Sequence, residues 1–558
     1  DELNIYAFGT GKPLLTSSEG MSEKWKQKCF TATKSALCFV TASSVAFHIS
    51  DHFSIDCSSA LPEQTQIFFQ GAARSLRAIA AIVIIATDYK YSLHGLLEDS
   101  ETYQYRLSEI HLRSATRIRK LCESNRGFYI KAGQFVASAR KIPKPYQSVL
   151  SSLQDQVVPC PFEDISKVLV NSFGENWKER FFSFDEQPVA AASIAQVHRA
   201  KLIGCHEVAV KVQYPGLERL MKIDTTTMAI LSKTISLIFP EYRFGWLVSQ
   251  FKSSLSAELD FVLEAKNCER TGENFKKNKM VKVPDIIWEL TSNKVLTMQF
   301  CNGFKVDDLE SMNKTGINPR KVAKLLFDLF AEMIFIHGFV HGDPHPGNIL
   351  VSPNGPKGFS LVLLDHGIYK QLDDDFLMNY CHLWKAMISL DSQKIMQIGE
   401  HFGVGKYSKL FPVMLTGRTI NSKSVLGSGM AAEEKRMLKQ ELKLMKMEDI
   451  STFMESLPPD LLALLRTDGL LTSIASRLGA SKQDRLLSYA KFALLGLRRN
   501  TETASKLRRS QNSGTLRTFQ TTWSWFEAKC LLEALEFLAW METIKEILYN
   551  LYKWAASR

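Results

Sequence analysis

The segment His341-Gly-Asp-Pro-His-Pro-Gly-Asn348, with Leu363-Leu-Asp-His-Gly367 shortly after it, constrains this chain more than any other feature. An acid and an amide, Asp343 and Asn348, stand five positions apart on a loop whose prolines and glycines predict a tight turn. The apolar residues around this loop predict short strands at 348–351 and 361–365. Phosphoryl transfer needs a divalent metal on the phosphates and a carboxylate aimed at the acceptor, and this pattern can supply both.

Each polar residue of these segments has a predicted role. Asp343 is expected to orient an acceptor hydroxyl, and Asn348 to bind a magnesium ion. Asp365 ends its predicted strand and Gly367 lets the backbone turn, so the carboxylate is expected to bridge the metal and the β- and γ-phosphates. The predicted cofactors are therefore ATP or ADP, and Mg²⁺. The alternative, a chance loop rich in Asp, Pro and Gly, is disfavoured by the strands around it.

A lysine inside an apolar strand is the second signal. Val208-Ala-Val-Lys211 lies in the second of two strands predicted at 195–202 and 207–213. A buried charge without a partner is costly, and the α- and β-phosphates of ATP are the natural anion, with a helix glutamate holding the lysine in place. Glu258 and Glu264 are the candidates, and Glu264 is preferred. An exposed charge on a helix surface is the alternative for each.

The glycine-rich phosphate loop expected before such a lysine is absent. The small residues at its place are Ala190, Ala191, Ala192 and Ser193. Their backbone N–H groups can still approach phosphate, but turns with positive φ become unfavourable, which predicts altered nucleotide choice or restrained transfer. A plain strand entry is the alternative. Adenine is predicted to lie at the end of a strand at 294–300, on backbone groups of Gln299 and Cys301.

The rest of the chain reads mainly as helix. Periodic apolar residues predict a helical region at 103–155, ended by the prolines around 143–145, and further helices at 258–267, at 321–337 and beyond 371. A charged run at 431–446 is most simply a solvated helix face, and 525–554 is expected to be amphipathic, docking on the body or on a membrane surface. Strands first and helices later predict a two-lobed α+β fold.

Bulk composition adds limits on partners. The net charge of +11 suits an anionic membrane surface, and no zinc-finger spacing or arginine-rich arm supports nucleic acid, which is not predicted as a partner. The 10 cysteines never form a CxxC pair, which predicts reduced thiols. Apolar stretches at 35–49 and 78–87 fall short of the ~20 residues of a membrane span. The second follows Arg74 and Arg77 and could lie in a membrane interface, but a buried helix is the favoured interpretation.

Six motifs, in order, resemble the UbiB or aarF-domain-containing atypical kinase family. They are Lys131-Ala-Gly-Gln134, the alanines before Ser193, Lys211, Glu258-Leu-Asp260, the Asp343 loop and Asp365. The resemblance covers roughly residues 105–370, and the Asp365-His-Gly367 variant with the 153–155 segment resembles the mitochondrial subgroup numbered first in animals. It implies a protein-kinase-like two-lobed fold with an N-terminal helical KxGQ extension and a helical C-terminal extension.

The resemblance also implies regulation and biological setting. In this family the KxGQ segment, here carrying Lys131 and Gln134, folds over the kinase lobes and blocks the site for a protein substrate, with Glu258 and Asp260 as its contacts near the phosphates. Members support isoprenoid-quinone or lipid homeostasis, often at the inner mitochondrial membrane, and act as ATPases or small-molecule kinases more readily than as protein kinases. Asp365-His-Gly367 departs from the family, which more often has phenylalanine there, and this puts the packing of the segment in question.

These observations predict five regions and leave three functions open. The regions are 1–100 with a targeting or membrane-associated segment, 101–160 with the helical KxGQ extension, 161–304 as an N-lobe, 305–500 as a helical C-lobe, and 501–558 as an amphipathic tail. The favoured function is a mitochondrial Mg-ATP-dependent kinase or ATPase acting on a lipid- or quinone-related small molecule. A nucleotide-gated scaffold without turnover is the first alternative and an ordinary protein kinase the second.

Overall fold

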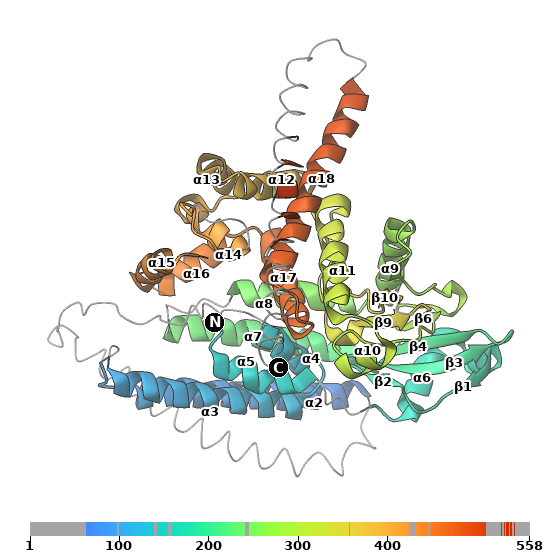
Figure 1. The fold of residues 1–558 in the computed structure, drawn as a ribbon. Helices are drawn as coiled ribbons and strands as arrows, with labels where there is room; N and C mark the ends of the chain where they lie inside the picture. The colour runs from blue at the N-terminus through green and yellow to red at the C-terminus, as the bar shows by residue number, and fades with distance from the viewer. Residues whose placement is uncertain are drawn as a thin grey trace, which may run out of the picture. The chain divides into compact units, whose positions relative to one another are not determined.

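The computed structural model describes residues 63–97, 100–138, 142–154, 159–239, 245–355, 358–422, 430–444 and 447–508, with single positions between 526 and 541. These residues form two compact units (Figure 1). Unit 1 comprises the chain up to residue 265 with 285–300 and 442–451; unit 2 comprises 266–284, 301–441 and the chain from 452 onward. The apolar stretch predicted at 35–49 lies outside the described residues, as does most of the predicted amphipathic end.

Unit 1 contains an antiparallel sheet in the order β1-β3-β4-β6. The short strand β2 also pairs with β3, at Gln196 and Val197. Its strands are β1 (Phe181–Phe184), β2 (Ala190–Ala191), β3 (Ala195–Leu202), β4 (Glu207–Gln213) and β6 (Val295–Gln299). The strands predicted at 195–202 and 207–213 are confirmed to the residue, and the strand predicted at 294–300 is one residue shorter at each end. Lys211 lies opposite Val197 on one side and Leu296 on the other, so it stands in the middle of the sheet.

The helices of unit 1 lie mainly before and after this sheet in sequence. They are α2 (Glu63–Ser92), α3 (Glu101–Asn125), α4 (Phe128–Ser138), α5 (Lys144–Leu150), α6 (Phe162–Phe173), α7 (Leu217–Ile238), α8 (Gly245–Glu258) and the start of α9 (Phe261–Phe275), with short η1 (Ser151–Gln154), η2 (Glu175–Arg180) and η3 (Trp288–Leu290). The region predicted as helical at 103–155 is thus broken by a turn at Arg126 and Gly127, which both have positive φ.

The helix ends differ from the sequence predictions at two places. Helix α4 ends at Ser138, before the prolines near residue 145, as predicted, but a further helix, α5, was not expected to begin at them; Pro145 falls in its first turn, where its missing N–H costs no hydrogen bond. The helix predicted at 258–267 is two helices, since α8 ends at Glu258 and α9 begins at Phe261. The carboxylate of Asp260 accepts hydrogen bonds from the backbone N–H groups of Val262 and Leu263, at 3.0 and 3.1 Å, and so caps α9.

The apolar face of α4 belongs to the core of unit 1. Phe128 and Phe135 are buried against Phe251 of α8 and Phe261 of α9, in a cluster that also includes Leu296 of β6. A second cluster lies around Trp177, where α6 covers the sheet. The KxGQ segment on α4 is therefore packed against α8 and α9, because the phenylalanines of α4 are buried in the same apolar cluster.

Helix α2 differs from its sequence prediction. It lies beside α3 and α7 (Figure 1), and within it Phe68–Ser92 is long and apolar enough to cross a membrane, with a mean hydropathy of 1.5. Only 17% of that window is buried. The preferred interpretation of 78–87 as a buried helix was therefore wrong: the apolar stretch is part of a helix about three times as long, and one face of it stays exposed.

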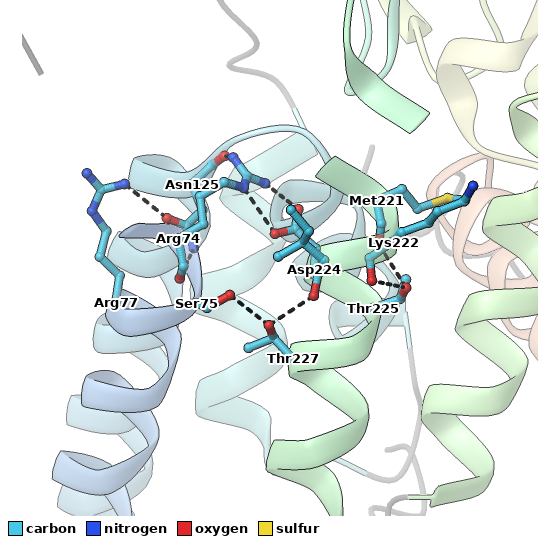
Figure 2. A network of polar contacts seen from close by, with 10 residues as sticks. Arg74, Ser75, Arg77, Asn125, Met221, Lys222, Asp224, Thr225 and Thr227 are labelled. Carbon is cyan, nitrogen blue, oxygen red and sulfur yellow. Dashed lines mark hydrogen bonds and ion pairs between the residues drawn. The ribbon is translucent and has the colours of Figure 1, made fainter. Parts of the chain in front are cut away.

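The buried face of α2 is joined to α7 and to the end of α3 by a network of polar contacts (Figure 2). The guanidinium of Arg74 donates to both carboxylate oxygens of Asp224, at 3.0 and 2.5 Å, and Asp224 is fully buried. Arg74 also donates to the carbonyl of Asn125, whose side-chain amide donates back to the carbonyl of Arg74 at 3.1 Å. Ser75 and Thr227 share a hydrogen bond of 2.8 Å.

Unit 2 contains a sheet in the order β5-β10-β9-β7 and a two-stranded pair, β8 with β11. The strands are β5 (Val281–Lys282), β7 (Phe304–Lys305), β8 (Phe339–His341), β9 (Ile349–Pro353), β10 (Phe359–Leu363) and β11 (Tyr369–Gln371). The strand predicted at 361–365 ends at Leu363, so Asp365 does not end a strand but lies in the loop after it. The short helical turn η5 (Pro346–Asn348) carries the end of the Asp343 loop.

The remainder of the described part of unit 2 is helical, as predicted for the chain beyond residue 371. The helices are the rest of α9, α10 (Leu309–Thr315), α11 (Pro319–Glu332) continued by η4 (Met333–His337), α12 (Asp374–Ile388), α13 (Ser392–His401), η6 (Gly405–Leu410), α14 (Phe411–Thr416), most of α15 (Ala432–Leu444), the end of α16 (Met447–Ser456), α17 (Pro459–Arg477) and α18 (Lys482–Arg508). Helix α11 is buried along one face against α17 and α18, and its core includes the inner faces of β9 and β10. The strands that carry the Asp343 loop and Asp365 therefore rest on a rigid helical base.

Candidate functional site

The lysine predicted to bind phosphates is held in unit 1 by the glutamate preferred from the sequence. Lys211 Nζ lies 2.7 Å from Oε1 of Glu264, in the first turn of α9, and the two side chains are 9% and 1% exposed. The ammonium group also lies 5.1 Å from the centre of the Phe261 ring. A charge this deeply placed is costly without an opposite charge beside it, and the Glu264 carboxylate supplies one. The pairing favours a lysine kept charged and directed for an anionic ligand.

The alanine segment forms a short strand followed by a tight turn. Ala190 and Ala191 pair with β3, and the N–H of Ala192 donates to the carbonyl of Ala195 at 2.8 Å. The hydroxyl of Tyr214 donates to the carbonyl of Ala192 at 3.0 Å, and Ser193 is buried. Among the described residues, non-glycine residues with positive φ occur at Arg126, Cys205 and Leu390 and not in this segment, which agrees with the turn geometry expected of alanine.

The KxGQ residues contact two different parts of unit 1. Lys131 Nζ lies 3.2 Å from Oε2 of Glu258 at the end of α8, and both side chains are mostly buried. Gln134 instead donates from Nε2 to the carbonyl of Leu153 at 3.1 Å. Gly133 between them packs closely: a Cβ there would lie 2.5 Å from the end of the Leu153 side chain, which would have to move. One residue of the motif thus contacts the acidic end of α8 and the other fixes α4 to η1, while Asp260 serves as the cap of α9.

The predicted adenine-binding residues lie at the end of β6 and just beyond it. The N–H of Gln299 donates to the carbonyl of Asp285 at 2.8 Å, so a hydrogen bond from this amide to adenine would have to replace that contact. Cys301 has a partly buried side chain and belongs to unit 2. No disulfide joins the cysteines in the described part of the chain.

In unit 2 the strand register brings the two predicted metal ligands together. Leu363 of β10 pairs with Ile349 of β9, and the N–H of Leu364 donates to the carbonyl of Asn348 at 2.9 Å. Asn348 therefore lies opposite Leu364, the neighbour of Asp365, at the ends of two adjacent strands. The amide Nδ2 of Asn348 donates to the carbonyl of Asp343 at 3.2 Å, and one carboxylate oxygen of Asp365 accepts from the N–H of Gly367 at 2.9 Å.

His341 joins the two catalytic segments, a role that sequence reasoning did not assign. Its Nε2 bonds to the carbonyl of Asp365 at 2.7 Å, and its Nδ1 accepts from the N–H of Asp343 at 3.1 Å. These two bonds require a neutral ring with its proton on Nε2. Burial lowers the pKa of His341, which favours that neutral form. Its place at the end of β8, two residues before Asp343, was the signal available in the sequence.

The oxygen donors of Asn348 and Asp365 fit a magnesium ion. Carboxylate and amide oxygens are hard ligands of the kind that Mg²⁺ prefers, and with Nδ2 bonded to Asp343 the amide of Asn348 has Oδ1 for a cation. No group of three or more His, Cys, Asp or Glu residues with metal-binding geometry occurs in the part of the chain that the structure describes. A magnesium ion held by two protein oxygens completes its coordination with water and phosphate.

Comparison with known proteins agrees with this geometry. Residues 152–399 match the model of the ABC1 atypical kinase-like domain. Over 413 residues the chain is 38% identical to AarF domain-containing protein kinase 1 of Gallus gallus, covering 73% of this chain and 79% of that protein. This chain belongs to the AarF domain-containing kinase family. The predicted family and the kinase-like α+β fold class are thereby confirmed.

Other relatives extend the match. The protein of the same name from Mus musculus is 36% identical over 450 residues, covering 79% of this chain and 86% of that one. "Probable serine/threonine-protein kinase abkB" of Dictyostelium discoideum is 36% identical over 442 residues, covering 78% of this chain and 64% of that one. The resemblance thus reaches well beyond the residues matched by the domain model.

The histidine of the Asp365-His-Gly367 variant is built into the unit 2 core. His366 is 1% exposed and stacks on Tyr369, with Nδ1 3.0 Å from the tyrosine hydroxyl and Nε2 3.1 Å from the carbonyl of Leu363. The side-chain amide of Asn267 donates to its backbone carbonyl at 3.1 Å. The ring of His366 thus makes a buried aromatic contact and adds polar bonds that hold the Asp365 loop.

The structure adds a charged neighbour of Asp343 that the sequence did not reveal. Arg466 of α17 places Nη2 3.9 Å from Oδ1 of Asp343, and the two side chains are 14% and 20% exposed. The residue lies beyond the region matched by the domain model. Its helical position, within a mostly apolar run, carries no motif signal, since arginine is common on helix surfaces.

Proposed function

We propose that this AarF-family protein binds Mg-ATP and transfers or hydrolyses its γ-phosphoryl group, acting on a lipid- or isoprenoid-quinone-related small molecule at a mitochondrial membrane. The observation that carries the proposal is the arrangement in unit 2, where His341 ties the backbone of Asp343 to that of Asp365 and Asn348 stands beside Asp365. A loop with only a structural role has no need of this set of oxygen donors. The mitochondrial setting and the acceptor class derive from the family resemblance.

In this proposal each side chain has a defined task. Lys211, kept charged by Glu264, binds the α- and β-phosphates. A bound magnesium ion supplies charge neutralisation on the phosphates, and Asn348 and Asp365 would hold it. Asp343 orients the acceptor hydroxyl, or a water molecule, and takes its proton. The backbone N–H groups of the alanine segment can approach phosphate because its side chains are small. They cannot form the positive-φ turns that a glycine-rich loop allows.

The contact between Lys131 and Glu258 favours a small-molecule substrate over a protein. Helix α4 shares a core with α8 and α9, the helix that carries Glu264, which supports the proposed role of the KxGQ segment in excluding a protein substrate. The same contact is also compatible with the scaffold alternative, in which nucleotide binding moves the KxGQ segment and no ATP is turned over. Asp343 discriminates between the two functions, since binding alone makes no use of its carboxylate.

We expect Asp365→Asn to abolish the rise in melting temperature that Mg-ATP produces in the wild type. The amide removes the charge that attracts the cation, and binding to the native state raises the melting temperature by mass action. The measurement is a thermal-shift titration with ATP, ADP and Mg²⁺, with Asp374→Asn, an exposed acidic residue of α12, as the matched control.

Asp343→Asn separates the enzyme from the scaffold when the Mg-ATP thermal shift and ATP consumption are both measured. As an enzyme, this variant keeps the Mg-ATP shift but loses ATP consumption, by a factor of at least about 100. If Asp343→Asn supports cellular function as well as the wild type does, the protein acts as a scaffold. Wild-type protein that never consumes ATP, with or without membranes or quinone-like headgroups, would likewise contradict the enzyme.

The membrane part of the proposal is supported by the exposed face of α2. Gly71, Arg74 and Ala78 recur at helical spacing on the face that packs on α7 and α3, where a Cβ on Gly71 would lie 2.4 Å from Ile223. The large apolar residues on the opposite side are exposed: Phe69, Leu76, Ile84 and Tyr91. A helix fixed on one face with an apolar stripe on the other suits shallow insertion into a lipid surface.

We expect the triple variant Phe69→Ser, Leu76→Ser, Ile84→Ser to lose most of its binding to phospholipid vesicles. Removing three apolar side chains from a lipid environment, at about 2 kcal/mol each, lowers the partition coefficient by roughly ten-thousandfold. Co-sedimentation with phosphatidylcholine vesicles, with and without an anionic phospholipid, measures it. The control substitutes serine for three exposed apolar residues elsewhere in unit 1, Phe182, Ile203 and Leu237. Equal binding by wild type and both variants would contradict a membrane role for α2.

A further inference from the structure

Helix α17 is tied to three other elements of unit 2 by charged side chains. The carboxylate of Asp460 lies 2.7 Å from Nζ of Lys370 on β11, the strand that follows the Asp365 loop. Asp468 accepts two hydrogen bonds from Nη1 of Arg485 on α18, at 2.9 and 3.0 Å, and both residues are buried. Between these two anchors stands Arg466, whose guanidinium faces Asp343.

The apolar side of the same helix fixes it further. Leu471 and Ile474 are buried in the core that includes α11 and the strands β9 and β10. Arg485 in addition donates to the carbonyl of Leu415 at 2.8 Å, which holds α18 in place behind α17. Arg466 is thus presented to the Asp343 loop from a helix with little freedom to move, as a group that directs another side chain must be.

The separation of Arg466 and Asp343 has a chemical consequence. At 3.9 Å the two opposite charges attract, but the distance is too long for a hydrogen bond. A shorter, bidentate arginine would occupy both carboxylate oxygens and compete with an acceptor for the lone pairs. A separation of 3.9 Å lets Arg466 attract the carboxylate without a bidentate bond between the two groups.

We propose that Arg466 is a positioning residue that orients the carboxylate of Asp343 for the acceptor. This inference rests on the proposed phosphoryl transfer and deepens it, because it extends the catalytic machinery to a helix outside the ABC1 domain match. The competing explanation is that Arg466 only helps to fold α17 onto the loop. Arg466 touches neither nucleotide nor metal in this role and acts through Asp343 alone.

The first test compares Arg466→Met and Arg466→Lys with wild type in Mg-ATP consumption. Methionine keeps much of the apolar stem, so we expect kcat to fall about ten- to a hundredfold through misorientation of Asp343, with the KM for ATP and the Mg-ATP thermal shift unchanged. Lysine keeps the charge and should retain most of kcat. The matched control is Arg477→Met on the same helix, where the exposed arginine lies 3.3 Å from Asp307. Equal losses in Arg466→Met and Arg477→Met, or a raised KM with unchanged kcat, would overturn the proposal.

A double-mutant cycle decides whether Arg466 acts through Asp343. In the Asp343→Asn background, Arg466→Met should cause no further loss of turnover, whereas independent roles give multiplied losses and overturn the inference. The same four proteins are also compared by thermal unfolding without nucleotide, where a coupled pair gives a shift in the double variant smaller than the sum of the single shifts. If the wild type consumes no ATP, the proposed function fails, and additive unfolding shifts would then reject the pairing on their own.

Discussion

Lys211→Met should eliminate the response to Mg-ATP and lower the stability of unit 1 at the same time. The nucleotide loses the cation that holds its phosphates, so we expect ATP consumption to fall at least about a hundredfold and the Mg-ATP thermal shift to disappear. Glu264, which is 1% exposed and lies 2.7 Å from Lys211 Nζ, would be left as a buried carboxylate without that charge. Breaking a buried pair from one side typically costs about 3–5 kcal/mol.

A second variant separates the two effects. Lys211→Met with Glu264→Gln removes the uncompensated charge, so stability should recover in part while the Mg-ATP response stays absent. Lys201→Met is the control, since this lysine is on the neighbouring strand β3, is exposed and lies 4.0 Å from Glu207. A full Mg-ATP shift in Lys211→Met, with the affinity of the wild type, would remove Lys211 from the nucleotide site.

Apolar patterning and charge pairing were enough to predict the strands and the paired charges of unit 1. The β3–β4 hairpin was predicted to the residue because apolar alternation and the Gly204 turn act over a few positions. The choice of Glu264 for Lys211 was also correct in geometry. The hairpin needed only local patterning, whereas Glu264 lies on α9, with two helices between it and β4, and was chosen because a lysine in an apolar strand needs an acid as its partner.

Most failures concern contacts that are distant in sequence. Helix α2 packs against α7 through contacts such as the close approach of Gly71 to Ile223, about 150 positions away. The break between α8 and α9 is different, because the cap formed by Asp260 is local and was missed all the same. Arg466 meets Asp343 across more than a hundred residues, and no periodicity marks it. Apolar patterning alone could not identify which face of α2 would be covered, because arginine in an apolar helix fits an interface as well as a buried ion pair.

Arg74→Met should cause the largest loss of stability in the N-terminal helices. Asp224 of α7 is 0% exposed. Its two carboxylate oxygens accept hydrogen bonds from Arg74 of α2, and these bonds link the two helices (Figure 2). Removing the guanidinium leaves a buried carboxylate, at a cost of about 3–5 kcal/mol. Arg77→Met is the matched control, since that arginine donates one bond of 3.3 Å to the side chain of Asn125, and its loss should cost about 1 kcal/mol.

The sign of the pH dependence makes this prediction specific. Burial raises the pKa of Asp224, and the hydrogen bonds and charge of Arg74 oppose that rise. Without Arg74 the folded-state pKa rises further above the unfolded value near 3.8, so the native state binds more protons and stability falls as pH increases through that range. Arg74→Met should therefore be less destabilised at pH 5 than at pH 8, measured by thermal unfolding, and Arg74→Met with Asp224→Asn should show no such difference. A pH-independent loss in Arg74→Met would mean that Asp224 is not the group left uncompensated.

The same variant should loosen the KxGQ helix. Arg74 bonds to the carbonyl of Asn125, the last residue of α3, and its guanidinium lies 5.4 Å from the ring of Tyr129 in α4. Because the turn between these helices leads directly to Lys131, loss of Arg74 removes two restraints on the segment that contacts Glu258. Hydrogen exchange should become faster in α2 and in α4 but not in β3 and β4. Unchanged exchange in α4, alongside faster exchange in α2, would show that the KxGQ helix is held by its apolar core alone.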